Sequence, residues 1–364
     1  MAPGAFNYRE IFMKTPFINI NLKKLEHNLA VIRQLCLDCH LDLTPVSKVV
    51  MGHPTIAQLF QRYSHSIGDS RICDLRRMVT HGIKGPFMLI RTPALSEVDE
   101  VAELAQISMQ SDLSVAKALH WQAMEKKINH QIIIMIEMGD LREGILMENF
   151  SDFLNTVASL KGLEVLGFGT NATCFAGLIP TPENLSFLYQ AQRIFKKCFA
   201  KEPLVSGGGS NLIPLMLNQS LPDVINHVRI GEAIVMGVDA IKSHAIPNCH
   251  QDCFTLYGEI IEIAVKPSGI SGLTAHNAFG ENMHLKDRGK RKRALLNIGR
   301  LDTDIHHIRP LRHGVEILGA SSDHLVLDVE EAGNLQTGDI LGFSLNYASL
   351  LFAMNSDYVI KNFI

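Results

Sequence analysis

The sequence predicts an α/β fold, namely an N-terminal (β/α)8 TIM barrel followed by a C-terminal all-β domain. From Pro16 to about Gly237, short apolar runs alternate with amphipathic segments, a pattern typical of repeated βα units. After about Ser243, the apolar runs are joined by turns that contain Gly, Asp and Asn. We therefore expect a barrel over residues 15–243 and an all-β domain over residues 244–364.

Apolar runs that stop at a definite position mark the predicted barrel strands. Eight such ends lie near Lys48, Asp69, Arg91, Gln110, Glu137, Thr170, Ser206 and Ile230. Amphipathic segments between them predict helices, for example over residues 22–37, 96–105, 115–127 and 183–199. Eight consecutive βα units close into a TIM barrel, although a six-stranded doubly wound sheet is the alternative that uncertain strand boundaries leave open.

The second domain is predicted from strands without intervening helices. These strands are expected over residues 253–265, 293–298, 314–319, 324–329 and 339–345. The basic run over residues 286–293 has mixed charge and a turn glycine, so it suits a solvated hairpin at least as well as an anion site. We assign no chemistry to it.

Composition and charge indicate an enzyme for small molecules. A chain of 364 residues with 46% hydrophobic content can bury one large core and one smaller one. The net charge of -3 gives no reason to expect nucleic acid or a membrane surface as a partner. No apolar run reaches transmembrane length, and no signal peptide is visible at the start. Residues 1–14 are weakly patterned, with Met13 as an alternative start, and are left out of the fold prediction.

The cysteines predict a reducing compartment. There are seven, an odd number, and none has the spacing of a zinc site. We expect reduced thiols, a cytoplasmic protein and no bound metal.

Lys48 is the first candidate for chemistry, at the end of the first predicted barrel strand. A charged lysine in an apolar strand is costly unless it is paired, deprotonated or covalently modified. A lysine that extends its amine to solvent at the strand end is the alternative. An imine with an aldehyde would remove the charge, which makes Lys48 a candidate Schiff-base lysine.

A glycine-rich loop after the seventh predicted strand is the second candidate. It comprises Ser206, Gly207, Gly208, Gly209, Ser210 and Asn211. Backbone N–H groups of such a loop at a helix start can bind a phosphate, and barrels commonly bind phosphate after strands seven and eight. A tight turn without a ligand is the alternative. Together with Lys48, the loop predicts that the chain holds pyridoxal 5'-phosphate (PLP).

Three further polar positions follow predicted strands. Arg229 ends the eighth strand, where it could donate to the pyridine nitrogen of PLP or form a surface ion pair with Glu232. Arg142 lies in a loop after the fifth strand and could reach a phenolate oxygen or a carboxylate. Asn171 follows the sixth strand and could lie near the cofactor ring, whereas Cys174 after it is more typically a small buried hydrophobe than a proton carrier.

These residues, in this order, resemble the fold-type III PLP enzymes, the superfamily of alanine racemase and ornithine decarboxylase. The resemblance extends from about Thr15 to the end and is nearest to the ornithine racemase group. The motifs that carry it are Gly68-Asp69-Ser70-Arg71-Ile72, Gly139-Asp140-Leu141-Arg142-Glu143-Gly144, Asn171-Ala172-Thr173-Cys174, Ser206-Gly207-Gly208, Arg229-Ile230-Gly231-Glu232 and Leu318-Gly319-Ala320-Ser321-Ser322-Asp323-His324.

The resemblance implies a role for each candidate. Lys48 would be the Schiff-base lysine, residues 206–211 and Gly231 would contact the phosphate, and Arg229 would face the pyridine nitrogen. It also implies a head-to-tail homodimer in which the β domain of one subunit completes the other's active site. The residues brought to the partner's cofactor would then be Asp302, Asp304, Ser322, Asp323, His324 and Tyr347.

The chain departs from the family pattern where alanine racemases carry a catalytic tyrosine. Their Gly-Tyr-x-Asp-Gly motif is replaced here by Gly299-Arg300-Leu301-Asp302-Thr303. The lysine that those enzymes carbamylate is Met135 in this chain. An ordinary alanine racemase is therefore not expected, and another group must carry the second proton.

Our hypothesis from the sequence is a PLP-dependent racemase of a free basic amino acid such as ornithine, lysine or arginine. Lys48 would move the α-proton on one face, while Asp323, His324 and Tyr347 are candidates for the other, with Tyr347 alternatively a phosphate contact. A decarboxylase is one alternative, although Ser322 lacks the acidity of the cysteine found in that branch. A non-catalytic PLP carrier is the other, although such a carrier would lack the second domain.

Overall fold

The computed structural model describes residues 14–364, and the alternative start Met13 lies outside them. The chain forms two compact units, one of residues 22–251 and one that joins residues 14–21 to residues 252–364. Each unit is described by itself.

The first unit is a barrel of eight parallel strands. They are β2 (Asp42–Pro45), β3 (Ile67–Asp69), β4 (Phe87–Leu89), β5 (Ile107–Gln110), β6 (His130–Met135), β7 (Leu163–Gly169), β8 (Leu204–Ser206) and β9 (His227–Ile230). Their order is β2-β9-β8-β7-β6-β5-β4-β3, and a parallel bridge between Val46 and Gly68 joins the two ends. The predicted TIM barrel is confirmed, and the six-stranded alternative is wrong.

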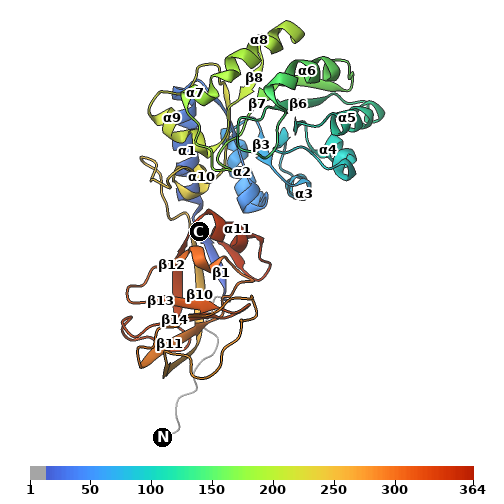
Figure 1. Cartoon of the computed structure of the whole chain (residues 1–364). Coiled ribbons are helices and arrows are strands. Elements are labelled where there is room, and N and C mark those ends of the chain that lie inside the picture. Colours follow the sequence, from blue (N-terminus) through green and yellow to red (C-terminus); the bar gives the residue numbers. More distant parts are fainter. Residues whose placement is uncertain (1–13) are drawn as a thin grey trace. The chain divides into compact units, whose positions relative to one another are not determined.

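Helices surround these strands (Figure 1). They are α1 (Leu22–Asp38), α2 (Pro54–Tyr63), α3 (Ile72–Thr80), α4 (Val98–Leu104), α5 (Leu113–Lys126), α6 (Phe150–Ala158), α7 (Pro182–Leu185), α8 (Phe187–Phe199), α9 (Ile213–Leu217) and α10 (Glu232–Met236). The single helix predicted over residues 183–199 is two, because Thr181 caps α7 and a break at Ser186 precedes α8.

Aromatic side chains join two helices to the strand layer. Phe150 of α6 and Phe195 of α8 lie on either side of Phe168 of β7, with ring centroids 5.5 and 6.0 Å from it. All three rings are fully buried, and aromatic contacts of this kind add to the free energy gained by burial. On α8, buried Leu188, Ala191 and Phe195 recur at the helical spacing that the sequence pattern indicated.

The second unit is mainly antiparallel sheet. Its strands are β1 (Phe17–Ile20), β10 (Phe254–Pro267), β11 (Lys290–Leu296), β12 (Ile308–Pro310), β13 (Glu316–Ala320), β14 (Leu325–Asp328), β15 (Ile340–Leu345) and β16 (Ile360–Phe363). The order is β12-β15-β10-β11-β14-β13, and β1 pairs with both β10 and β16. The five strands predicted for this domain correspond to β10, β11, β13, β14 and β15.

Several elements of this unit, β12 among them, were not expected from the sequence. The chain ends with helix α11 (Tyr347–Asn355) and β16, and β1 comes from the start of the chain. Because β1 forms its hydrogen bonds with β10 and β16, the structure groups residues 14–21 with residues 252–364, although the sequence pattern favoured a division at 243. The predicted basic hairpin is partly strand, since β11 begins at Lys290.

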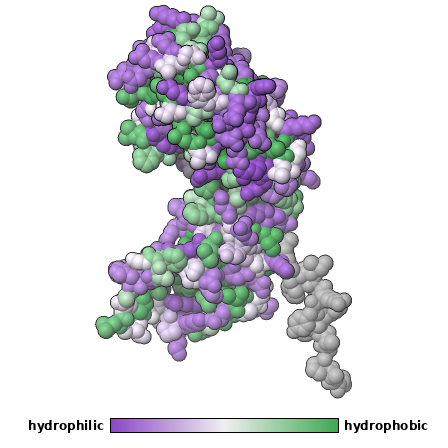
Figure 2. Space-filling model, turned by 90° about the vertical axis from the view of Figure 1, so that its right-hand side faces the viewer, coloured by the Kyte–Doolittle hydropathy of each residue, from purple (hydrophilic) through white to green (hydrophobic). Residues whose placement is uncertain are grey.

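The surface shows no dominant apolar face in the view of Figure 2, where hydrophilic and hydrophobic residues are interspersed. Within residues 14–364, no helix is both long and apolar enough to cross a membrane. None of the seven cysteines, all of which lie in the described part of the chain, is in a disulfide bond.

A buried asparagine joins helix α1 to the end of the barrel unit by hydrogen bonds. Asn28 of α1 is fully buried, donates to the carbonyl oxygens of Ile234 and His250 at 3.1 and 2.8 Å, and accepts from the His250 N–H at 2.7 Å. Asn28→Ala would leave these backbone groups unsatisfied, so we expect it to lower the free energy of unfolding by about 2–4 kcal/mol. Urea denaturation followed by circular dichroism measures this.

The matched control is Asn129→Ala, because Asn129 is exposed and makes only a 3.5 Å contact with Glu164. Its effect should stay within about 0.5 kcal/mol. Equal effects of the two substitutions would contradict the role of Asn28.

Candidate functional site

The predicted cofactor residues of the barrel lie where its strands end. Lys48, Arg142, Asn171, the loop over residues 206–211 and Arg229 follow or end β2, β6, β7, β8 and β9 respectively. The carboxyl ends of parallel strands meet at one end of a barrel, which is where barrel enzymes hold their reactive groups.

Lys48 lies in a short turn rather than at the end of a strand as predicted. Strand β2 ends at Pro45, and Lys48 opens the 3₁₀ turn η1 (Lys48–Val50). Its side chain is half-buried. The turn closes with Met51 and Gly52, both at φ 55, and a Cβ on Gly52 would lie 2.9 Å from the Asp74 carbonyl oxygen. Only glycine fits that approach without displacement.

A hydrogen bond from the residue before Lys48 anchors this turn to β3. The Ser47 hydroxyl donates to Asp69 Oδ2 at 2.6 Å, and the Ser47 N–H donates to the Gly68 carbonyl oxygen at 2.8 Å. Asp69 is fully buried and also accepts from the Arg71 N–H at 3.0 Å. Lys48 is therefore carried on a turn whose base is fixed to the neighbouring strand.

Asp69 belongs to a pair of buried carboxyl groups. Burial, followed by the nearby Asp74 carboxylate, raises the pKa of Asp69 to about 7. Asp74 is itself 4% exposed and forms an ion pair with Arg77 at 2.9 Å. Burial also raises the pKa of Glu232, at the start of α10, to about 7, against the opposing effect of the Lys48 charge. Two carboxyl groups that titrate near neutrality thus lie around Lys48.

The glycine loop opens a short helix, as predicted. Its residues lead into the 3₁₀ turn η4 (Ser210–Leu212) and then α9. A Cβ on Gly209 would lie 2.7 Å from the Arg229 carbonyl oxygen, and Gly208 adopts φ 149. Asn211 Oδ1 accepts from the Gly209 N–H at 2.9 Å, and the Ser210 hydroxyl oxygen accepts from the Ala233 N–H at 3.0 Å. The side chains of Ser210 and Asn211 therefore fix the loop, and Gly209 leaves no space for a side chain.

Gly231 closes the other side of this loop at the end of β9. A Cβ on it would lie 3.0 Å from the Val46 carbonyl oxygen, close to the turn that carries Lys48. The glycines that the sequence singled out thus occupy tight positions in the structure.

Arg229 is a buried cation and not part of a surface ion pair. Its guanidinium is held by Ser206 and Thr170: Nη1 donates to the Ser206 hydroxyl and, at 3.3 Å, to the Ser206 carbonyl oxygen, while Nη2 donates to the Thr170 carbonyl oxygen at 2.9 Å. The residue is 7% exposed. Burial lowers its pKa to about 10, so the guanidinium remains charged at neutral pH.

Two loops after β6 and β7 are joined by the buried carboxylate of Asp140. It accepts from the N–H groups of Phe175 and Ala176 at 3.3 and 3.2 Å and lies 3.5 Å from Asn171 Nδ2. Arg142, in the first loop, is exposed and forms an ion pair with Glu143, with Nη2 to Oε1 at 2.5 Å. Cys174 is exposed and not buried as its residue type indicated.

The remaining candidates belong to the β-domain unit. Asp323 is exposed, and its Oδ1 lies 3.2 Å from Nδ1 of His324 in the turn between β13 and β14. Tyr347 is the first residue of α11, which Asn346 caps. Arg300 forms a bidentate ion pair with Glu281 at 2.8 and 2.6 Å.

Sequence reasoning missed several polar residues of the barrel end. Asp69 was predicted only as a strand end, and neither Ser47 nor His227 was predicted as a site residue, although His227 lies two residues before Arg229. Residues two apart on a strand point to the same face of the sheet, so the spacing alone could have placed His227 beside Arg229. Thr170 contributes a backbone carbonyl, which no residue-type argument identifies.

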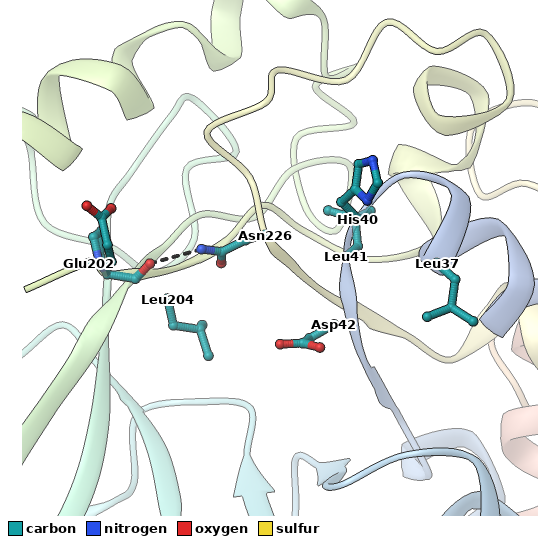
Figure 3. A pocket seen from close by; sticks show the side chains of 8 residues that line it. Leu37, His40, Leu41, Asp42, Glu202, Leu204 and Asn226 are labelled. Carbon is teal, nitrogen blue, oxygen red and sulfur yellow. Dashed lines mark hydrogen bonds between the residues drawn. The ribbon is translucent and has the colours of Figure 1, made fainter.

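A surface pocket lies at the opposite end of the barrel (Figure 3). It has a volume of about 470 Å³ and is lined by Leu37, His40, Leu41, Asp42, Glu202, Pro203, Leu204 and Asn226. These residues lie at the starts of β2, β8 and β9, and Asn226 Nδ2 donates to the Pro203 carbonyl oxygen at 3.0 Å. None of the predicted site residues lines this pocket.

The raised pKa of Asp69 predicts a pH dependence of stability. An unfolded aspartate titrates near pH 3.9, so between that pH and about 7 the unfolded state binds fewer protons than the folded state. The contribution of Asp69 to stability is therefore present at low pH and is lost as the pH rises. We expect Asp69→Asn to flatten the decline of the unfolding free energy between about pH 5 and pH 7.5.

Urea denaturation at several pH values measures this slope. Asp152→Asn is the control, because Asp152 is an exposed carboxylate on α6. If Asp69→Asn leaves the same slope as Asp152→Asn, Asp69 does not carry the proton assigned to it.

The chain has relatives among amino-acid racemases. Residues 20–239 match the family described as alanine racemase, N-terminal domain. The chain is 38% identical to a lysine racemase of Thermotoga maritima over 351 residues, covering 96% of this chain and 98% of the relative. It is 36% identical to an ornithine racemase of Acetoanaerobium sticklandii over 354 residues, covering 96% and 99%.

Solved structures share the fold at lower identity. An alanine racemase from D-cycloserine-producing Streptomyces lavendulae superposes with a TM-score of 0.76 at 15% identity, over 97% of this chain and 98% of that one. An alanine racemase from Bartonella henselae with covalently bound pyridoxal phosphate gives 0.70 at 15% identity, over 97% and 100%. Because the family match extends over more than half of the chain, and the two racemases align with nearly all of it, this chain belongs to the alanine racemase N-terminal domain family.

Proposed function

We propose that this chain racemises a free basic amino acid, of the size of lysine or ornithine, with PLP as its cofactor. The observation that carries the proposal is the buried, charged guanidinium of Arg229 at the barrel end that also bears Lys48 and the glycine loop. Similarity to a lysine racemase and an ornithine racemase along nearly the whole chain supports the substrate class.

The residues present fit PLP in three respects. Lys48 supplies a half-buried amine on a fixed turn. Residues 207–209 are glycines, and a Cβ on any of them would come close to other atoms of the same chain. Such backbone without side chains suits a phosphate contact, to which Ser206, Ser210, Asn211 and Gly231 are proposed to contribute. Arg229 supplies a permanent donor for a ring nitrogen. The Bartonella henselae structure, with the same fold, carries this cofactor covalently.

PLP would supply an aldehyde that captures amines as imines and an electron-withdrawing ring that acidifies the substrate's α-proton. In this proposal Lys48 holds the cofactor and then takes or returns that proton on one face. Arg229, whose pKa of about 10 keeps it protonated, would donate a hydrogen bond to the ring nitrogen without transferring a proton to it. Arg142 and Asn171 lie in the loops after β6 and β7 and are proposed to contact the ring's hydroxyl side.

The second proton carrier is proposed to come from a partner subunit. Asp323 and His324 share a hydrogen-bonding contact in an exposed turn, which would let the pair relay a proton, and Tyr347 is proposed as a phosphate contact. Asp323 alternatively binds the distal ammonium of a basic substrate. These assignments require a head-to-tail homodimer in which one β domain reaches the other barrel.

Exposed apolar side chains support such a dimer. Four of them lie in the loops after β6 and β7, each more than half exposed: Leu141, Leu146, Phe175 and Ile179. The Ala176 N–H donates to the Asp140 carbonyl oxygen at 3.3 Å, so the two loops form one surface beside the site. Contact with a partner would bury these side chains. Seven cysteines without a disulfide among the described residues support a reducing compartment, proposed to be the cytoplasm.

The alternatives have less support. A decarboxylase of this superfamily needs a carboxylate near the pyridine nitrogen, whereas the buried group at the end of β9 is Arg229. A PLP carrier of the single-barrel kind has no β domain, whereas residues 252–364 form one here. Both relatives with high identity are named as racemases.

The proposal is tested by incubating the PLP-loaded protein with L-ornithine, L-lysine, L-arginine and L-alanine in deuterated water. Chiral chromatography with mass spectrometry should show D-isomers that carry deuterium at the α-carbon, with the basic amino acids turned over fastest. Formation of an amine in place of the D-isomer would replace racemisation by decarboxylation. No product from any of the amino acids would contradict an enzyme of this substrate class.

Lys48→Ala should reduce racemisation at least about a hundredfold, because the amine acts as both cofactor anchor and proton carrier. Lys84→Ala, at an exposed lysine between α3 and β4, is the matched control and should leave the rate unchanged. Comparable loss in both variants would contradict the assignment of Lys48.

A further inference from the structure

A chain of hydrogen bonds leads from Arg229 across the buried interior of the barrel. The Arg229 guanidinium donates to the Ser206 hydroxyl, which lies 2.7 Å from Nδ1 of His227. The opposite ring nitrogen, Nε2 of His227, lies 2.9 Å from Oγ1 of Thr44, which lies 2.6 Å from Oγ of Ser66. Three strands, β2, β8 and β9, contribute to this chain.

His227 is uncharged in this setting. It is 3% exposed, and burial together with the nearby Arg229 charge lowers its pKa to about 3. A second positive charge beside the buried guanidinium would have no carboxylate among its hydrogen-bond partners. One of the two ring nitrogens therefore carries a proton and the other accepts one.

Counting protons decides which nitrogen carries the proton. The Ser206 oxygen accepts from Arg229, so its single hydroxyl proton points elsewhere, and Nδ1 of His227 is the acceptor beside it. If Nδ1 carried the proton instead, both Arg229 and His227 would donate to the Ser206 oxygen, and the Ser206 hydroxyl proton would lose Nδ1 as its acceptor. With a proton on Nε2, Arg229 donates to Ser206, Ser206 to His227, His227 to Thr44 and Thr44 to Ser66, so each of the three middle members accepts once and donates once.

We infer that His227, as the Nε2–H tautomer, is a positioning residue for Arg229. By accepting the Ser206 proton, it turns the lone pairs of the Ser206 oxygen toward the guanidinium and fixes its orientation. Hydrogen bonds in such a chain polarise and strengthen one another in a buried setting. Given the proposed function, the consequence is a fixed donor for the PLP ring nitrogen; the tautomer itself does not depend on that function.

A second buried histidine provides a matched comparison. His130 of β6 is 1% exposed, and its Nε2 lies 2.9 Å from the Ser108 hydroxyl. Ser108 also accepts from Gln110, and no hydrogen bond of His130 leads to Arg229. Burial lowers the pKa of His130 to about 4. The two histidines are alike in burial and in having a serine partner, and differ in the link to the guanidinium.

Neutron diffraction from crystals of the PLP-loaded protein exchanged into deuterated water tests the inference without any substitution. We expect deuterium on Nε2 of His227, none on Nδ1, and the Ser206 deuteron directed at Nδ1. Deuterium on Nδ1, with or without Nε2, would overturn the inference. The protonation of His227 is read directly, so this result is independent of whether the chain proves to be a racemase.

Two substitutions at His227 separate positioning from packing. In His227→Asn, the side-chain oxygen reaches the place of Nδ1 and can still accept from Ser206. In His227→Gln, the amide reaches the place of Nε2 and retains only the contact with Thr44. We expect the Gln variant to bind PLP about tenfold to a hundredfold more weakly, and the Asn variant to stay within about threefold of the parent protein.

His130→Gln is the control and should leave the PLP dissociation constant within about twofold, with circular dichroism confirming that all variants fold. Weakening by the same factor in His227→Gln and His130→Gln would reduce His227 to a packing residue and overturn the inference. Equal weakening in the Asn and Gln variants would do the same.

Discussion

The carboxyl end of the barrel depends on the hydrogen bonds that hold the buried Arg229 guanidinium. A charge that is almost fully buried is tolerated only where its N–H groups find acceptors, and here Ser206 and Thr170 supply them from the ends of β8 and β7. The glycine loop passes directly over the backbone of Arg229, because only glycine allows that approach at Gly209. Strand ends, loop conformation and charge are therefore fixed together.

Burial is the main cause of the pKa shifts at this end of the barrel, and at His227 the Arg229 charge adds to it. Burial and Arg229 keep His227 neutral, so the imidazole can orient the neighbouring hydroxyls without adding a second positive charge. Asp69 and Glu232, near the turn of Lys48, have pKa values that burial raises to about 7. A cofactor with a dianionic phosphate suits this combination of one fixed cation and two carboxyl groups that titrate near neutral pH.

The sequence identified the barrel because strand and helix periodicity repeated eight times, and it located every barrel strand end within a few residues. It placed Lys48 on a strand, whereas β2 ends earlier, since a 3₁₀ turn of apolar residues has no periodicity that distinguishes it. It assigned β1 to no sheet because the partners β10 and β16 are far away in the chain. The hydroxyls of Ser47 and Ser206 and the carboxyl of Asp69 gain their roles only from tertiary hydrogen bonds, which local pattern does not encode.

We propose that PLP binds to Lys48. Borohydride reduction of the PLP-loaded protein, followed by proteolysis and mass spectrometry, is the first measurement to make, because reduction makes the imine permanent. We expect one phosphopyridoxyl group, on the peptide that contains Lys48. A phosphopyridoxyl group on a different lysine, or none after reduction, would contradict it.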